Sequence, residues 1–379
     1  MAELQLSGER FRVTYHLWGT PAEVEAVARS ISIEQTVEFP RELVTDEAIR
    51  DHVFGRIELM SLVNDDVVGH YRVVISYAIE VAGVELTQLL NVIFGNISLQ
   101  PSIRVERLEL PPTLLEHFRG PRFGRRGLRR LVGVDDRPLL CSAIKPMGLA
   151  PEVLAGFAHS FALGGVDFIK DDHGLADQPF CRFEERVERC VDAVERGNRQ
   201  TGGHCLYLPN VTAPAEQMMD RIRFAKEAGV GGLLVAPGLV GWDVMRRLAD
   251  DDDIALPILA HPALMGSYIV GDKEGFSHYA LFGQIMRLCG ADAVIFPHQG
   301  GRFTFSGDDC RGLVKGTEVP MGNLKASFPV PAGGMSLERV PEMCRFYGTE
   351  VIFLIGGDLH RRGDLVESCR EFRRRVESV

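Results

Sequence analysis

The amino-acid sequence predicts an α/β protein in which a C-terminal (β/α)8 TIM barrel follows a small α+β domain. The chain has 379 residues, which exceeds one average domain. The first 120 residues mix strand-like and helix-like patterns, whereas short apolar strands alternate with amphipathic helices from residue 138 onward. Such a run of eight βα units matches a closed barrel. A doubly wound open sheet is the alternative, but the regular spacing of eight strands favours closure.

Residues 1–120 are predicted to form the small α+β domain. The expected strands are Arg10–Trp18, Val67–Tyr77 and Leu86–Phe94, and the expected helix is Pro21–Ile31. A helical pattern at Gln88–Phe94 competes with the last strand, so both readings stay open. Residues 121–137 are the predicted connector, because Gly120–Gly127 is rich in Gly, Pro and Arg.

Residues 138–379 are predicted to form the barrel. The expected strands are Leu139–Lys145, Val166–Lys170, His204–Asn210, Gly232–Ala236, Pro257–His261, Ala293–Phe296, Lys325–Ala332 and Glu350–Ile355. The helices expected between them include Pro151–Leu163, Phe183–Arg199, Pro214–Ala228, Val244–Asp250, Phe276–Cys289 and Leu337–Tyr347. In a closed barrel, functional groups gather at the C-terminal ends of the strands.

Composition and charge narrow the class of protein. The sequence is 45% hydrophobic and 25% charged, as in ordinary globular proteins. A formal net charge of −10 argues against nucleic acid as a partner, because phosphate backbones require clustered Lys and Arg. Neither a signal peptide nor a membrane-spanning run is evident. The eight cysteines show no CxxC spacing, so we expect free thiols in a cytoplasmic protein.

Polar residues and glycine pairs gather at the ends of the predicted strands. Lysine and aspartate are costly in a barrel interior unless they are paired or bound. Glycine pairs after strands seven and eight leave bare backbone N–H groups where barrels often bind phosphate. The rim residues are Lys145, Lys170, Asp171, Asp172, His173, Asn210, His261, His298, Arg302, Gly333, Gly334, Gly356 and Gly357. Each has an ordinary structural explanation when taken alone. Their shared rim predicts a site for a phosphorylated small molecule, with or without a divalent metal.

Several segments resemble motifs of the ribulose bisphosphate carboxylase (RuBisCO) family. Gly164–Asp172 resembles the metal-site motif, and Ile144-Lys145-Pro146 resembles the motif of the first barrel strand. Glu34-Gln-Thr36 and Phe94-Gly-Asn96 resemble two motifs of the N-terminal domain. Further matches follow in order at Gly120–Gly127, Asn210, His261-Pro-Ala, Val330–Gly334 and Gly356-Gly357. The chain therefore looks like a RuBisCO-like protein over nearly its whole length.

The resemblance implies a metal site and an acid/base at the barrel rim. Lys170, carbamylated by CO2, would bind a divalent metal together with Asp172 and His173. The metal is Mg2+ in the family, and His173 makes Mn2+ or another ion an alternative. Lys145 would move protons at the reacting carbons of the substrate.

The resemblance also implies how substrate and partner are held. Asn210 would contact the metal or the substrate, and His261 would bind a substrate hydroxyl. His298 or Arg302 would close over the substrate with the strand-6 loop. Phosphate would be cradled by Gly333, Gly334, Gly356 and Gly357. Glu34 and Asn96 would reach the site from a partner subunit, which implies a homodimer or a higher homo-oligomer.

Departures from the RuBisCO pattern argue against fixation of CO2. His173 stands where RuBisCO has a glutamate, and imidazole is a poor ligand for Mg2+. Arg302 stands at about the position of the lysine that orients CO2 in RuBisCO. The side chains that would grip a second phosphate are replaced at Pro262, near Ile295 and at Ala332. The expected substrate is therefore monophosphorylated.

The resemblance thus implies an enzyme that forms and stabilises the enediolate of a monophosphorylated keto sugar. The favoured reading is an isomerase or tautomerase, or the related enolase, on a substrate like methylthioribulose 1-phosphate. The second is a decarboxylase or hydrolase of a 3-oxo sugar-acid phosphate of the 3-oxo-isoapionate 4-phosphate type. The third is a non-catalytic binding or regulatory relative. The sequence leaves these three open, because every enzymatic version stabilises the same kind of enolate.

Overall fold

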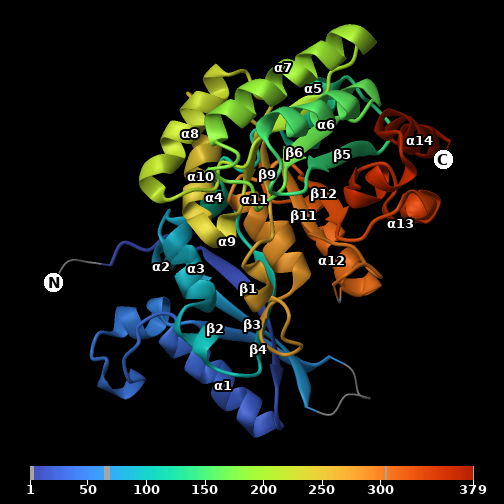
Figure 1. Cartoon of the computed structure of the whole chain (residues 1–379). Helices are drawn as coiled ribbons and strands as arrows, with labels where there is room; N and C mark the ends of the chain where they lie inside the picture. The colour runs from blue at the N-terminus through green and yellow to red at the C-terminus, as the bar shows by residue number, and fades with distance from the viewer. Residues whose placement is uncertain (1–3, 64–68, 304, 379) are drawn as a thin grey trace.

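The computed structural model describes residues 4–63, 69–303 and 305–378, and it places an open sheet below a parallel barrel (Figure 1). The sheet has five strands in the order β10-β4-β1-β3-β2. They are β1 (Arg10–Trp18), β2 (Arg56–Leu62), β3 (His70–Ala78), β4 (Ile103–Glu109) and β10 (Gly275–Phe276). The pairs of β1 with β3 and β4, and of β2 with β3, are antiparallel, whereas β10 runs parallel to β4.

Alternating side chains fix the inner face of this sheet. Phe11, Val13, Tyr15 and Leu17 in β1 are at most 1% exposed, as the two-residue period of a strand requires. The hydroxyl of Tyr15 donates to the carbonyl of Ile93 at 2.8 Å. This bond ties β1 to a helix on the covered face of the sheet. The helices of this region are α1 (Pro21–Glu34), α2 (Ile79–Ala82), α3 (Leu86–Phe94) and α4 (Pro112–Leu115).

Part of the sequence-based reading of this region was wrong. Leu86–Phe94 is a helix, so the strand reading fails and the competing helical pattern is confirmed. The reason is visible in its buried residues Leu86, Leu89, Val92 and Ile93, which follow helical spacing. Strands β2 and β4 were not predicted. Both faces of β2 are exposed, and the solvent-facing residues of β4 are charged. The strand expected at Val67–Tyr77 is β3, and its residues 67 and 68 lie outside the described residues.

Eight parallel strands form the barrel, as predicted. They are β5 (Leu139–Ile144), β6 (Phe168–Asp171), β7 (Leu206–Leu208), β8 (Leu233–Val235), β9 (Ile258–Ala260), β11 (Ala293–Pro297), β12 (Phe328–Ala332) and β13 (Ile352–Leu354). The hydrogen-bonded sets are β13-β5-β6-β7 and β12-β11-β9-β8. A parallel bridge between Asn210 and Leu234 joins β7 to β8, and β12 contacts β13, so the ring closes. The interior is filled by strand residues such as Cys141, Phe168 and Leu259.

Helices surround this ring. They are α6 (Pro151–Leu163), α7 (Phe183–Thr201), α8 (Ala215–Glu227), α9 (Pro237–Val240), α10 (Trp242–Asp250), α11 (Met286–Leu288), α12 (Gly307–Glu318), α13 (Val340–Tyr347) and α14 (Leu365–Glu377). The helix predicted at Phe276–Cys289 is divided differently. It starts with β10, continues as a π-helix over Tyr279–Ile285 that we call η5, and ends with α11. The boundaries at residues 120 and 137 stay predictions, and between them lies helix α5 (Gly124–Val132).

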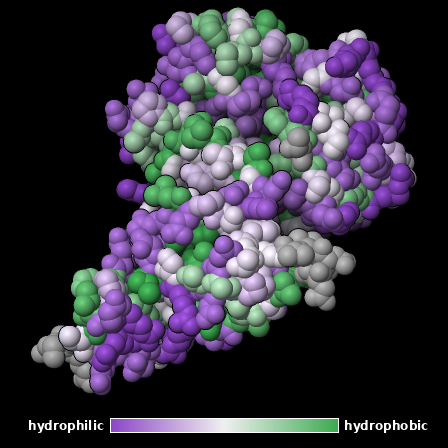
Figure 2. Space-filling view, turned by 90° about the horizontal axis from the view of Figure 1, so that it is seen from below, coloured by the Kyte–Doolittle hydropathy of each residue, from purple (hydrophilic) through white to green (hydrophobic). Residues whose placement is uncertain are grey.

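The distribution of polar and apolar residues on the surface is that of an ordinary globular protein. Seen from below, the molecule is mainly hydrophilic, and its apolar residues form separate patches (Figure 2). In the part of the chain that the structure describes, no helix combines the length and the apolar character that crossing a membrane requires.

Candidate functional site

The rim of the barrel brings three predicted residues into direct contact. Lys145 follows the last residue of β5, and its Nζ lies 3.2 Å from Oδ2 of Asp172. The Nδ1 atom of His173 lies 3.3 Å from the other carboxylate oxygen of Asp172. Burial would raise the pKa of Asp172, but the N–H of Gly174 and the ammonium groups of Lys145 and Lys170 lower it. Asp172 is therefore a carboxylate that holds one cation and one imidazole.

Lys170 lies deeper in the same rim. It is 4% exposed, and its Nζ donates to the backbone carbonyl of Asp171 at 2.9 Å. Burial is the main cause that lowers the pKa of Lys170, and the charge of Lys145 lowers it further. The amine of Lys170 is therefore more readily uncharged than an exposed lysine.

The neighbouring aspartate, Asp171, points away from the rim and has a structural role. Its side chain is fully buried and pairs with the guanidinium of Arg186 at 3.2 Å. Tyr207 donates to Asp171 at 2.6 Å, and the backbone N–H of Asn210 donates at 2.9 Å. Sequence reasoning missed Arg186 and Tyr207. Arg186 lies among the many charged residues of α7, and only its burial distinguishes it.

Asn210 holds the loop after β6 in this structure. Its side-chain amide donates to the carbonyls of His173 and Leu175 at 3.0 and 2.9 Å, and its Oδ1 accepts from the N–H of Thr212. The predicted direct contact of Asn210 with metal or substrate stays a prediction. What the described contacts support is a fixed position for His173.

His261 is a neutral imidazole stacked on His173. The ring centroids are 4.4 Å apart and the planes differ by 9°. Burial lowers the pKa of His261 to about 2, and the charges of Lys170 and His173 add to this effect. The Nδ1 atom accepts from the N–H of Ala263 at 3.2 Å, so the hydrogen of the neutral ring lies on Nε2. His261 can therefore donate one hydrogen bond from Nε2.

The two glycine pairs lie next to these groups and to each other. Gly333 and Gly334 have φ angles of 84° and 108°, which favour glycine. A Cβ on Gly356 would lie 3.2 Å from Cε of Lys145, so the lysine side chain packs directly against this glycine. Asp358 accepts from the N–H of Leu337 at 3.0 Å and thereby joins the turn after β13 to the segment after β12. The predicted phosphate cradle and the predicted base are thus adjacent.

The loop that follows β11, the sixth strand of the barrel, is docked on the cradle, and we call residues 298–303 the strand-6 loop. The N–H groups of His298 and Arg302 donate to the carbonyls of Ala332 and Gly333 at 2.8 and 2.9 Å. His298 is 1% exposed; burial lowers its pKa to about 4, and its Nδ1 bonds the Tyr347 hydroxyl at 2.8 Å. Among the described residues its Nε2 has no hydrogen-bond partner. Arg302 is exposed beside Gly334.

Glu34 and Asn96 meet each other in the N-terminal region. The side-chain amide of Asn96 donates to Glu34 at 2.9 Å. Within the described residues of one chain, no hydrogen bond or ion pair joins this pair to Lys145, Lys170 or Asp172. Their predicted role in the site of a partner subunit stays a prediction.

The residues of the rim fit a divalent metal only if Lys170 is carbamylated. Among the described residues, no group of three or more His, Cys, Asp and Glu side chains is arranged to hold a metal ion. Asp172 and His173 supply two donor groups, and an ammonium on Lys170 supplies none. A carbamate on Lys170 would add the missing oxygen donor, so the residues fit a metal once Lys170 is carbamylated.

Comparison with known families agrees with this fold and rim. The family described as "Ribulose bisphosphate carboxylase large chain, catalytic domain" matches residues 125–364. The 5-methylthioribulose-1-phosphate isomerase of Rhodospirillum rubrum is 42% identical over 366 residues, covering 96% of this chain and 95% of that protein. The 2,3-diketo-5-methylthiopentyl-1-phosphate enolase of Geobacillus kaustophilus is 32% identical, covering 94% and 88%.

Solved structures show the same similarity. The crystal structure of a Rubisco-like protein from Rhodopseudomonas palustris superposes with a TM-score of 0.86 at 40% identity, covering 97% of this chain and 98% of that one. A dimeric archaeal Rubisco from Hyperthermus butylicus gives a TM-score of 0.86 at 26% identity, covering 99% and 91%. Fold and rim together define an α/β-barrel protein of the RuBisCO type. The chain belongs to the RuBisCO large-chain family, and the predicted family and fold class are confirmed.

Proposed function

We propose that this protein is an isomerase or tautomerase that forms the enediolate of a monophosphorylated ketose similar to methylthioribulose 1-phosphate. The observation that carries this proposal is the position of Lys145, which lies between Asp172 and the glycine cradle at Gly356. A substrate phosphate in the cradle would bring the carbons of its sugar close to the amine. The 42% identity with an enzyme named for this substrate supports the proposal.

The residues of this chain have distinct tasks in the proposed reaction. Lys145 takes the proton from a carbon next to the ketone and returns it to another carbon of the enediolate. No co-reactant is consumed, because the proton that leaves one carbon returns to another. Asp172 holds the lysine at 3.2 Å, and Nε2 of His261 donates to a substrate hydroxyl.

A divalent metal belongs to the proposal. Carbamylated Lys170, Asp172 and His173 would hold the ion, which would stabilise the negative charge on the enolate oxygen. Carbamate formation requires an uncharged amine, and the lowered pKa of Lys170 favours that form.

Fixation of CO2 is not part of the proposal. The replacements at Pro262 and Ala332 leave no side-chain grip for a second phosphate, and Arg302 stands in place of the lysine that orients CO2. Gly333 and Gly334 have the positive φ angles expected of the proposed cradle, which supports binding of one phosphate.

Deuterium exchange tests the proposed reaction. In D2O with methylthioribulose 1-phosphate, the protein should introduce deuterium next to the carbonyl and form an isomer. Lys145→Met should reduce exchange by at least ~10²-fold while a competitive substrate analogue still binds, because a general acid/base is lost and the anchors remain. Exchange by Lys145→Met at the parent rate would exclude Lys145 as the base.

Assays with other substrates separate the alternative functions. Ribulose bisphosphate with labelled bicarbonate should yield no fixed carbon, and any fixation would overturn the interpretation of the departures. Product from a 3-oxo sugar-acid phosphate, without exchange on the ketose, would favour the decarboxylase or hydrolase. Absence of exchange and product with both substrates would favour a binding or regulatory protein.

A further inference from the structure

A close contact between a histidine and an aspartate lies at the far end of the strand-6 loop, outside the rim described above. The Nδ1 atom of His278 lies 3.0 Å from Oδ1 of Asp309, and the two side chains are 8% and 31% exposed. A carboxylate only accepts, so Nδ1 carries the hydrogen. The approach does not meet the geometry of a hydrogen bond, so we describe it as a close polar contact. The contact with His278 is the largest cause that lowers the pKa of Asp309.

Asp309 connects this contact to the start of helix α12, which follows the loop that carries Arg302. Its other oxygen accepts from the N–H and the hydroxyl of Ser306 at 2.9 and 2.7 Å, which caps helix α12. Phe305, the residue before this cap, places its ring edge against His278 with centroids 4.3 Å apart. His278 therefore contacts two residues at the point where the loop joins helix α12.

His278 is in turn anchored on the N-terminal sheet. The preceding residue, Ser277, donates from its N–H to Val105 and from its hydroxyl to Glu106, at 2.8 and 2.7 Å. Both acceptors are carbonyls of β4, which pairs with β10 just before. Further along η5, the side-chain amide of Gln284 exchanges two hydrogen bonds with the backbone of Leu108, at 2.8 and 2.7 Å.

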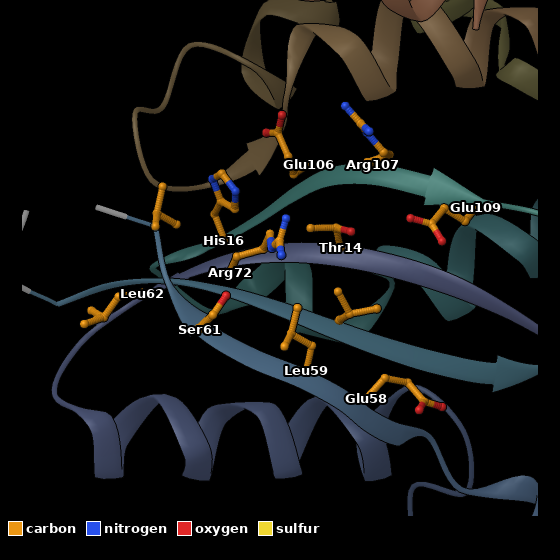
Figure 3. A pocket seen from close by; sticks show the side chains of 12 residues that line it. Thr14, His16, Glu58, Leu59, Ser61, Leu62, Arg72, Glu106, Arg107 and Glu109 are labelled. Atoms are coloured by element: carbon orange, nitrogen blue, oxygen red, sulfur yellow. The ribbon is translucent and has the colours of Figure 1, made fainter. Parts of the chain in front are cut away.

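Side chains on the open face of the sheet also connect β4 to η5. A hollow of about 720 Å³ lies on this face, and Figure 3 shows Glu106 and Arg107 pointing from β4 toward the neighbouring helical segment. The guanidinium carbon of Arg107 lies 4.6 Å from the ring centroid of Tyr279 in η5. Burial raises the pKa of Glu106, and the charge of Asp309 raises it further.

We propose that His278 is a positioning residue that transmits the placement of strand β4 to the strand-6 loop through its contacts with Asp309 and Phe305. The N–H groups of His298 and Arg302 also fix the loop, because they donate to Ala332 and Gly333, so the loop is held along its length in the docked position. The pair therefore keeps Arg302 beside the phosphate cradle. Only the expected effect on phosphorylated ligands rests on the proposed function; the effect on the loop does not.

Substitution of each partner tests the contact between His278 and Asp309. His278→Asn and Asp309→Asn should each increase hydrogen exchange of the amides in residues 298–303, with no ligand present. Each should weaken binding of inorganic phosphate, or raise KM for the ketose, by about 5- to 10-fold while kcat changes little. The double variant should be no worse than either single variant, because the same contact is lost.

Asp308→Asn is the matched control. Asp308 lies in the same first turn of α12 but is 91% exposed and pairs with Arg311, so its loss changes the helix terminus without touching His278. Additive losses in the double variant, or a lower melting temperature without faster loop exchange, would reduce His278 to a structural residue. Faster loop exchange in a protein that shows no isomerase activity would keep this inference and reject the proposed function.

Discussion

Two adjacent aspartates at the end of β6 have opposite orientations. Asp172 faces Lys145 at the rim, whereas Asp171 faces Arg186 in the interior with both side chains fully buried. The one-residue offset along a strand explains this, because successive side chains point to opposite faces. The sequence motif alone assigns the pair to the site, and only the structure shows that Asp171 supports the strand.

Loss of the partner of Asp171 should be severe. Arg186→Met leaves a buried carboxylate without a cation, and we expect the free energy of unfolding to fall by about 3–5 kcal/mol. Urea unfolding followed by circular dichroism measures this change. In the control variant Arg189→Met, the lost pairs are 45–55% exposed, so the change should stay below about 1 kcal/mol. Equal effects of the two variants would contradict the assigned role of Arg186.

The metal prediction also belongs to single residues. Activity should be lost on chelation and restored by divalent ions, with Mn2+ at least as effective as Mg2+, because His173 offers a nitrogen donor. Added bicarbonate should raise activity if Lys170 is carbamylated, and 13C NMR with labelled bicarbonate should show a carbamate signal that is absent in Lys170→Met. Full turnover after chelation would remove the metal from the proposal and leave the barrel fold untouched.

At the scale of elements, the strand-6 loop illustrates what sequence can and cannot predict. The strand before it was predicted from its apolar run, and Arg302 was predicted from its place in the motif. The docking of the loop was not predictable, because it depends on a backbone hydrogen bond to Gly333 and on the contact of His278 with Asp309. These partners lie far apart along the chain, and no local pattern marks them.

The N-terminal elements show the same limit. Alternation in β1 predicts a strand because one face is buried, whereas β2 is exposed almost throughout and carries no such signal. The segment Leu86–Phe94 is so apolar that strand and helix patterns compete, and burial of one helical face decides between them. For the site, the rim residues were predictable because strand ends converge in a barrel, whereas Asn210 proved to support the loop of His173.

Close approach of two glycines gives a prediction for the docked loop. A Cβ on Gly301 would collide with the carbonyl oxygen of Gly333, so Gly301→Ala should push the loop off the cradle. Inorganic phosphate should then bind at least about 10-fold more weakly by isothermal titration calorimetry. Gly312→Ala is the control, since open space surrounds that position in α12 and alanine should favour the helix. Unchanged phosphate affinity in Gly301→Ala would show that docking does not shape the cradle.

The whole molecule is expected to work as at least a dimer with shared sites. Glu34 and Asn96 bond each other at 2.9 Å, and within one chain no described hydrogen bond or ion pair connects them to the rim. Mixing inactive Asn96→Ala with inactive Lys145→Met should restore part of the activity, because a hybrid dimer contains one intact site. Failure to complement, with subunit exchange verified by mass spectrometry, would place each site within one chain.

The pairing of β10 with β4 has a consequence for how such proteins recombine. The chain leaves the N-terminal sheet, builds five of the eight barrel strands, and returns to add one more strand to that sheet before completing the ring. A cut between residues 120 and 138 would therefore not yield two interchangeable cassettes, since the first fragment would lack its fifth strand. Chimaeras between relatives should exchange residues 275–285 together with the N-terminal region, because this inserted segment carries both the edge strand and His278.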